Sequence, residues 1–170
     1  MVNPLAAFAF PPRQFGRALW IMLIALAILA VVWSLQLSGY QPCELCLSER
    51  YALCGGAALA ALTALAAAGG RPGWARVGFG VLALAFLANA VLSGYHAGVE
   101  YHFWEGPTAC TGALSGPLNV EDMLKQIQSA QIVRCDEAAL RILGVSLAGW
   151  GLVANAALSA YAALATRLSR

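Results

Sequence analysis

Four of the five cysteines form two groups that could exchange disulfides. Cys43 and Cys46 are separated by two residues, whereas Cys110 and Cys135 lie farther along the chain. Two cysteines at the shorter spacing can close a small disulfide at the start of a helix, where the helix dipole stabilises a thiolate. Arg50 follows Cys46 by four residues and therefore lies on the same face of a helix. We expect its guanidinium to favour a reactive thiolate at Cys46.

Three other uses of this cysteine pair compete with a redox role. A zinc site would need a second close pair of ligands, which the distant Cys110 and Cys135 do not supply, so no metal is expected. Covalent haem attachment would need a histidine directly after Cys46, where the chain has Leu47. Two structural disulfides are a stronger alternative, but the CxxC loop is so short that closing it constrains the unfolded chain very little. The pair is therefore better explained by redox chemistry.

The composition predicts that membrane helices position these cysteines. The chain is 61% hydrophobic and 11% charged, whereas soluble domains carry about 25% charged residues. A soluble core of this size could not bury so much apolar surface, so lipid is the natural solvent. Four stretches can each span a hydrocarbon core of roughly 30 Å; they cover residues 18–37, 51–68, 77–95 and 142–165. We expect an all-α membrane protein, a single domain built as a four-transmembrane-helix bundle.

The charges predict the orientation of the bundle. If the helices alternate, six arginines fall on one side of the membrane: Arg13, Arg17, Arg71, Arg76, Arg167 and Arg170. The positive-inside rule makes that side the cytoplasm, so both termini are expected there. The outer side then receives a short loop, residues 38–50, and a long loop, residues 96–141. Four cysteines fall in these loops, facing a compartment in which disulfides persist. The sequence has no run of basic residues of the kind that binds nucleic acids.

Further features are expected within the long loop and the spans. Asn119 is a typical helix N-cap with acids behind it, and apolar residues then recur at helical spacing. This pattern predicts a short amphipathic helix that lies on the membrane surface, or packs against the outer end of the bundle. Asn89 and Asn155 are typical of hydrogen bonds between membrane helices. Cys54 is typical of a small buried thiol.

The segment from Pro42 to Tyr51, PCELCLSERY, resembles the first periplasmic loop of the DsbB family. The resemblance extends to four spans, cytoplasmic termini and a second cysteine pair in a long second outer loop. Members of this family are quinone-dependent thiol oxidases of the bacterial inner membrane that reoxidise DsbA. The resemblance implies a thiol:quinone oxidoreductase that takes electrons from a DsbA-like periplasmic protein and passes them to ubiquinone or menaquinone.

The resemblance also implies a role for each loop cysteine. Cys43 and Cys46 match the pair nearest the quinone, with Cys46 as the thiolate beside the quinone ring. Cys110 and Cys135 match the distal pair, in which Cys110 is attacked by the reduced partner. Electrons would then pass from the partner to the distal pair and on to the proximal pair.

Two further residues carry over to the quinone site. Arg50 matches the family arginine that supports quinone reactivity, and His96, at the outer end of the third span, matches the family histidine near the quinone. His102 lies six residues farther on and is a second candidate for that histidine.

Three alternatives stay open at the level of sequence. The chain could be an oxidase dedicated to one special partner, as in DsbI-like proteins. It could be a quinone reductase similar to vitamin K epoxide reductase, although that family has its CxxC late in the chain. It could also be a non-enzymatic membrane scaffold with structural disulfides.

Overall fold

The described part of the chain forms a bundle of long helices. The computed structural model describes residues 13–107 and 134–168. Within them lie the helices α2 (Arg13–Leu37), α3 (Glu44–Ala68), α4 (Pro72–Glu100) and α6 (Leu147–Leu168). All four are long and apolar enough to cross a membrane. The predicted all-α, four-helix membrane bundle is therefore confirmed, while the amphipathic helix predicted after Asn119 lies outside the described residues.

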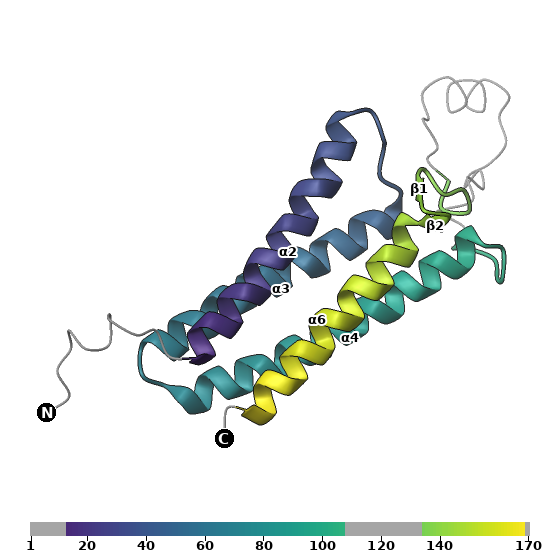
Figure 1. The fold of residues 1–170 in the computed structure, drawn as a ribbon. Helices are drawn as coiled ribbons and strands as arrows, with labels where there is room; N and C mark the ends of the chain where they lie inside the picture. Colours follow the sequence, from purple (N-terminus) through teal and green to yellow (C-terminus); the bar gives the residue numbers. More distant parts are fainter. Residues whose placement is uncertain (1–12, 108–133, 169–170) are drawn as a thin grey trace, which may run out of the picture.

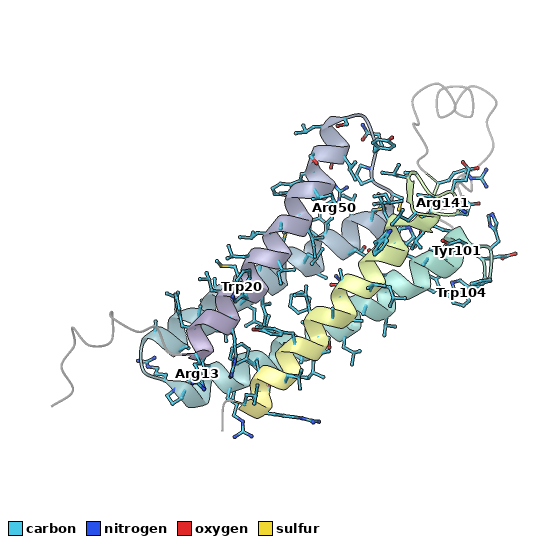
Figure 2. All side chains as sticks on the ribbon, in the orientation of Figure 1. Arg13, Trp20, Arg50, Tyr101, Trp104 and Arg141 are labelled. Atoms are coloured by element: carbon cyan, nitrogen blue, oxygen red, sulfur yellow. The ribbon has the colours of Figure 1, made fainter. Side chains whose placement is uncertain are left out.

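The helices pack mainly as two antiparallel pairs. α2 lies along α3, α4 lies along α6, and α3 packs on α4, whereas α2 and α6 touch little. Figure 1 shows the beginning of α2 and the end of α6 at one end of the bundle. The start of α3 and the end of α4 lie at the opposite end. Figure 2 likewise shows Arg13 at one end and Arg141, Tyr101 and Trp104 at the other.

Proline and glycine set the boundaries of α3 and α4. Cys43 is the N-cap of α3 and follows Pro42, which disfavours helix in the residue before it. At the other end, Gly70 adopts a φ of 68°, a left-handed conformation that glycine reaches without steric cost. Pro72 then begins α4, where its missing N–H costs no helical hydrogen bond.

A small hairpin replaces the predicted start of the fourth span. The span was expected to begin at residue 142, but α6 begins at Leu147. Strands β1 (Arg141–Ile142) and β2 (Val145–Ser146) pair antiparallel ahead of it. The two residues between them, Leu143 and Gly144, have φ values of 53° and 81°, which is the conformation of a two-residue hairpin turn. The apolar character of this segment predicted helix, whereas the turn breaks it.

Small residues allow close packing in the bundle core. Alanines of α2, α3 and α6 are fully or nearly fully buried around the rings of Phe79 and Phe86. A Cβ atom at Gly56 would lie 2.7 Å from the ring of Phe86, so only glycine fits against it. Helices that approach this closely gain van der Waals contact, which is the main source of association between membrane helices.

Of the two polar predictions for the spans, one is confirmed and one is wrong. Asn89 Nδ2 donates to Asn155 Oδ1 at 3.0 Å, and both side chains are buried between α4 and α6. Cys54 was expected to be buried but is exposed on α3, where it lines an apolar cavity between α3 and α2. Lipid-facing positions are as apolar as core positions in a membrane helix, so hydrophobicity did not distinguish them.

Candidate active site

Cys43 and Cys46 meet at the first turn of α3. The sulfur of Cys43 accepts a hydrogen bond from the backbone N–H of Cys46 at 3.3 Å, which caps the helix. The two sulfur atoms lie 2.9 Å apart. A disulfide between them, with an S–S bond of about 2.05 Å, needs only small side-chain rotations. The pair therefore opens the second helix as predicted, and its geometry suits a disulfide that forms and breaks.

His96 reaches this pair from α4. Its Nε2 atom lies 3.5 Å from the sulfur of Cys43, and its ring is 2% exposed. On the other side of the ring, Nδ1 lies 2.7 Å from Oε1 of Glu49. Oε2 of Glu49 accepts a hydrogen bond from Ser93 at 3.0 Å. A buried chain of contacts thus links Cys43 through His96 to Glu49.

The surroundings of Cys43 favour its thiolate. A hydrogen bond from the Cys46 side chain, together with the His96 ring and the Cys46 N–H, outweighs burial and lowers the pKa of Cys43 to about 4. With both thiols reduced, these contacts place the negative charge on Cys43. The predicted thiolate at Cys46 stays a prediction.

Arg50 lies close to this cluster but is held by α2. Its Nη1 atom donates to Oε1 of Gln36 at 2.5 Å, and its Nη2 atom donates to the carbonyl of Val32 at 3.4 Å. Its side chain lines the same cavity as Cys46. The guanidinium thus bridges α3 to α2 beside the cysteine pair, and its predicted effect on Cys46 stays untested.

An apolar cavity of about 500 Å³ opens beside the cysteine pair. Its α2 wall is entirely aliphatic, while Leu147, Ala148 and Ala154 line it from α6. Polar side chains also line it, among them Cys46, Arg50 and His96. Ligand sites commonly combine apolar walls with a few placed polar groups in this way. The cavity could therefore hold a flat apolar molecule with a polar group directed at the sulfurs.

Cys135 lies next to the proximal pair. It is 1% exposed and packs in one apolar cluster with Cys43, Leu45 and Val99, with Cys46 at the edge of that cluster. It takes part in a disulfide. Its predicted partner, Cys110, lies outside the described residues. The structure thus brings three of the four predicted cysteines together, although they are separated by up to 92 positions of sequence (135 − 43).

The second histidine does not join the cluster. His102 follows the end of α4, is exposed and has a φ of 61°. His96 is therefore the histidine that the fold places beside the sulfurs.

Sequence reasoning missed Glu49 and Ser93 as parts of this site. Glu49 is one of eight acidic residues in the chain, and no role was assigned to it from the sequence. Its position three residues after Cys46, on the same helix face, is the signal that could have placed it in the site.

Metal binding is a weaker use of the same atoms. Donor atoms of Cys43, Cys46 and His96 lie within 4.8 Å of one another. A structural zinc site uses four such donors, and this cluster supplies three. We therefore interpret it as a thiol and imidazole cluster.

Comparisons with known proteins agree with the resemblance seen in the sequence. Residues 14–165 match the family described as "Disulfide bond formation protein DsbB". A curated protein of Herminiimonas arsenicoxydans, named "Disulfide bond formation protein B", is 33% identical over 142 residues. The match covers 78% of this chain and 82% of that protein. No solved structure matches the chain significantly.

Proposed function

Because the chain belongs to the DsbB family of disulfide bond formation proteins, we propose that it is a thiol:quinone oxidoreductase of the bacterial inner membrane. Family membership makes it a multi-pass membrane protein with disulfide oxidoreductase activity. The proposal adds a DsbA-type periplasmic dithiol protein as the electron donor and a membrane quinone as the acceptor. One observation carries it: Cys43 and Cys46 meet at the edge of an apolar cavity, with Cys135 packed beside them.

The cavity fits the head group of a quinone. A quinone is a flat ring that needs apolar contact on its faces and hydrogen-bond donors near its two oxygens. The aliphatic wall of α2 could supply the first, while Arg50 and His96 also line the cavity and could supply the second. A bound quinone would accept the two electrons and two protons that a dithiol releases when it becomes a disulfide.

The thiol chemistry proceeds in two exchanges. In the first, a thiolate of the reduced partner attacks Cys110, a bond to the partner forms, and the predicted Cys110–Cys135 disulfide breaks with the electron pair on Cys135. In the second, the Cys135 thiolate attacks Cys43 and releases Cys46 as a thiolate. The shared apolar cluster of Cys135 and Cys43 supports this second step, because both side chains are buried in the same group of packed residues.

The cysteines then return to their oxidised state. The second thiolate of the partner attacks the partner sulfur bonded to Cys110, so the partner leaves as a disulfide and Cys110 is released as a thiolate. Cys110 then attacks Cys135, so the distal disulfide forms again and Cys43 is released as a thiolate. Cys43 bonds to Cys46 again as the pair gives up its two electrons. The N-cap position and His96 make Cys43 a good leaving group and nucleophile in these steps.

The proposed orientation places this chemistry in the periplasm. The cysteine cluster lies at the end of the bundle opposite the beginning of α2 and the end of α6. Arg13 and Arg17 of α2, and Arg167 of α6, belong to that opposite end, which the positive-inside rule assigns to the cytoplasm.

A reconstituted assay tests the proposal. Purified protein in lipid, supplied with a reduced DsbA-type protein and a quinone, should oxidise the former and reduce the latter. Cys46→Ser and Cys110→Ser should each abolish turnover, whereas Cys54→Ser should retain it because Cys54 lies outside the cluster. Turnover that survives in both of the first two variants would refute the scheme. Disulfides that remain oxidised when quinone is depleted and reduced partner is present would favour a scaffold instead.

A further inference from the structure

We propose that Glu49 is a positioning residue that sets His96 to take the proton of Cys43, forming a Cys43–His96–Glu49 relay. This inference rests on the proposed function, because it assigns the group that prepares Cys43 for thiol exchange. It adds a carboxylate to a site for which the sequence indicated only cysteines, an arginine and a histidine.

The first argument is the geometry of the ring. Nδ1 of His96 lies 2.7 Å from a carboxylate oxygen of Glu49, which is the length of a charge-assisted hydrogen bond. A carboxylate accepts only, so Nδ1 must carry the hydrogen. The lone pair of the neutral ring is then at Nε2, 3.5 Å from the sulfur of Cys43. Glu49 thus fixes the one tautomer that can accept the thiol proton.

The second argument is how firmly Glu49 is held. Ser93 donates to its second carboxylate oxygen at 3.0 Å, and Asn89 donates to its backbone carbonyl at 3.3 Å. Gly151 of α6 packs against it, since a Cβ atom there would lie 3.2 Å from both Oε2 of Glu49 and Oγ of Ser93. Three helices therefore enclose a side chain that is only 13% exposed. An enclosed acid within a membrane helix is costly, and such acids usually serve function.

Other charged groups near the ring do not offer the same contact. Glu100 is the nearest: its Oε1 lies 3.8 Å from Nε2 of His96, beyond hydrogen-bond length and on the nitrogen that faces Cys43. The remaining titratable side chains that line the cavity are Tyr40, Cys46, Arg50, Arg134 and Glu137, and α2 and α6 contribute none to its lining. Among the groups that the structure describes around the cavity, only Glu49 makes a hydrogen bond with Nδ1 of His96.

The relay performs one proton transfer. The proton leaves the sulfur of Cys43 and binds Nε2 of His96, while the sulfur keeps the bonding electron pair. Glu49 stabilises the positive charge that the ring gains and keeps its hydrogen bond to Nδ1, as the acid of a catalytic triad does. This step transfers a proton and no electrons, so it needs no oxidant or reductant. The relay ends at the Cys43 thiolate, and closing the disulfide with Cys46 is a separate step that would need the proposed quinone to take up two electrons.

The test measures Cys43 directly, without quinone or partner. Full-length protein in detergent is fully reduced, treated with iodoacetamide from pH 4 to pH 10, and the modified Cys43 peptide is quantified by mass spectrometry. Glu49→Ala should raise the midpoint of the alkylation profile by about one pH unit or more, a tenfold change in the acid constant. Glu49→Gln keeps an oxygen that can accept from Nδ1 but loses the charge, so it should give a smaller shift in the same direction.

Glu44→Gln is the matched control. Glu44 is exposed on the first turn of the same helix, and its loss changes the net charge equally. Removing this nearby negative charge should leave the midpoint unchanged or lower it slightly. Midpoints of both Glu49 variants that equal the wild-type value would overturn the relay. If Glu49→Ala fails to fold, Glu49→Gln decides alone. Because the assay contains no quinone, a wild-type protein that fails to reduce quinone would refute the proposed function and leave this result standing.

Discussion

Replacing His96 with asparagine should make the Cys43–Cys46 disulfide less oxidising. An asparagine keeps an N–H group near the position of Nδ1, so Glu49 retains a donor, but it removes the Nε2 atom that lies 3.5 Å from Cys43. The thiolate of Cys43 then loses a partner that lowers its pKa. Since that thiolate stabilises the reduced pair, its loss favours the disulfide.

The size of the effect follows from the lost contact. A hydrogen bond to a charged group contributes about 1.5–3 kcal/mol, which corresponds to a rise of about 1–2 units in the pKa of Cys43. For a two-electron couple about 1.4 kcal/mol equals 30 mV, so the reduction potential should fall by roughly 30–60 mV at pH 7.

The pH dependence gives the sign of the effect. The pKa of Cys43 is lowered to about 4, so its thiolate stabilises the reduced pair above that pH and the stabilisation is lost as pH falls through it. The wild type and the variant should therefore differ fully at pH 7, and the gap should close as the pH is lowered toward 4.

Redox equilibration measures this potential. Quinone-free protein is equilibrated in dithiol buffers of known potential at several pH values, free thiols are alkylated, and the modified cysteines are counted by mass spectrometry. His102→Asn is the control, because His102 is exposed, lies outside the cluster and has a positive φ that asparagine tolerates. Equal potentials for wild type and His96→Asn at pH 7 would refute the role of His96 in stabilising the thiolate.

Three further changes test the packing that supports the site. Asn89→Leu removes a buried hydrogen bond to α6 and should lower stability to unfolding in SDS by about 0.6–1.7 kcal/mol; unchanged stability would mean that the amide contributes nothing. Gly98→Ala places a Cβ atom against the indole of Trp104 and should lower the free energy of unfolding by about 1–3 kcal/mol. Gly80→Ala is the control, because a Cβ atom there meets open space and should not lower it. Equal effects of the two substitutions would contradict the contact. Leu143 has a left-handed φ of 53°, which is strained for leucine. Leu143→Gly should remove this strain and raise the thermal midpoint, with a stabilisation of about 1–2 kcal/mol. A lower midpoint would argue against strain at this position.

Local features of the site were predictable from the sequence. Pro42 ends the preceding loop, and the cysteine pair lies at the start of a helix as predicted, because helix starts depend on neighbouring residues. The spans were predictable because lipid imposes a minimum apolar length. The hydrogen bond between Asn89 and Asn155 was predictable because an amide in a span needs a partner.

The sequence alone did not predict which distant residues would contact one another in the site. Glu49 and His96 are separated by 47 positions (96 − 49), and only the packing of α3 on α4 brings them together. Glu49 was one acid among eight, and hydropathy does not tell which acid turns inward. The same limit explains Cys54, since inward and lipid-facing positions of a membrane helix are equally apolar. The hairpin before α6 was missed because its residues are as apolar as the span that follows.

The most direct test follows electrons into the quinone in a single turnover. Protein in lipid vesicles with one equivalent of quinone is mixed anaerobically with a reduced DsbA-type protein, and the loss of quinone absorbance is recorded. The account predicts one quinone reduced for each dithiol oxidised, with no reduction by Cys46→Ser and full reduction by Cys54→Ser. Loss of quinone at the wild-type rate in Cys46→Ser, or no loss in the wild type, would contradict it.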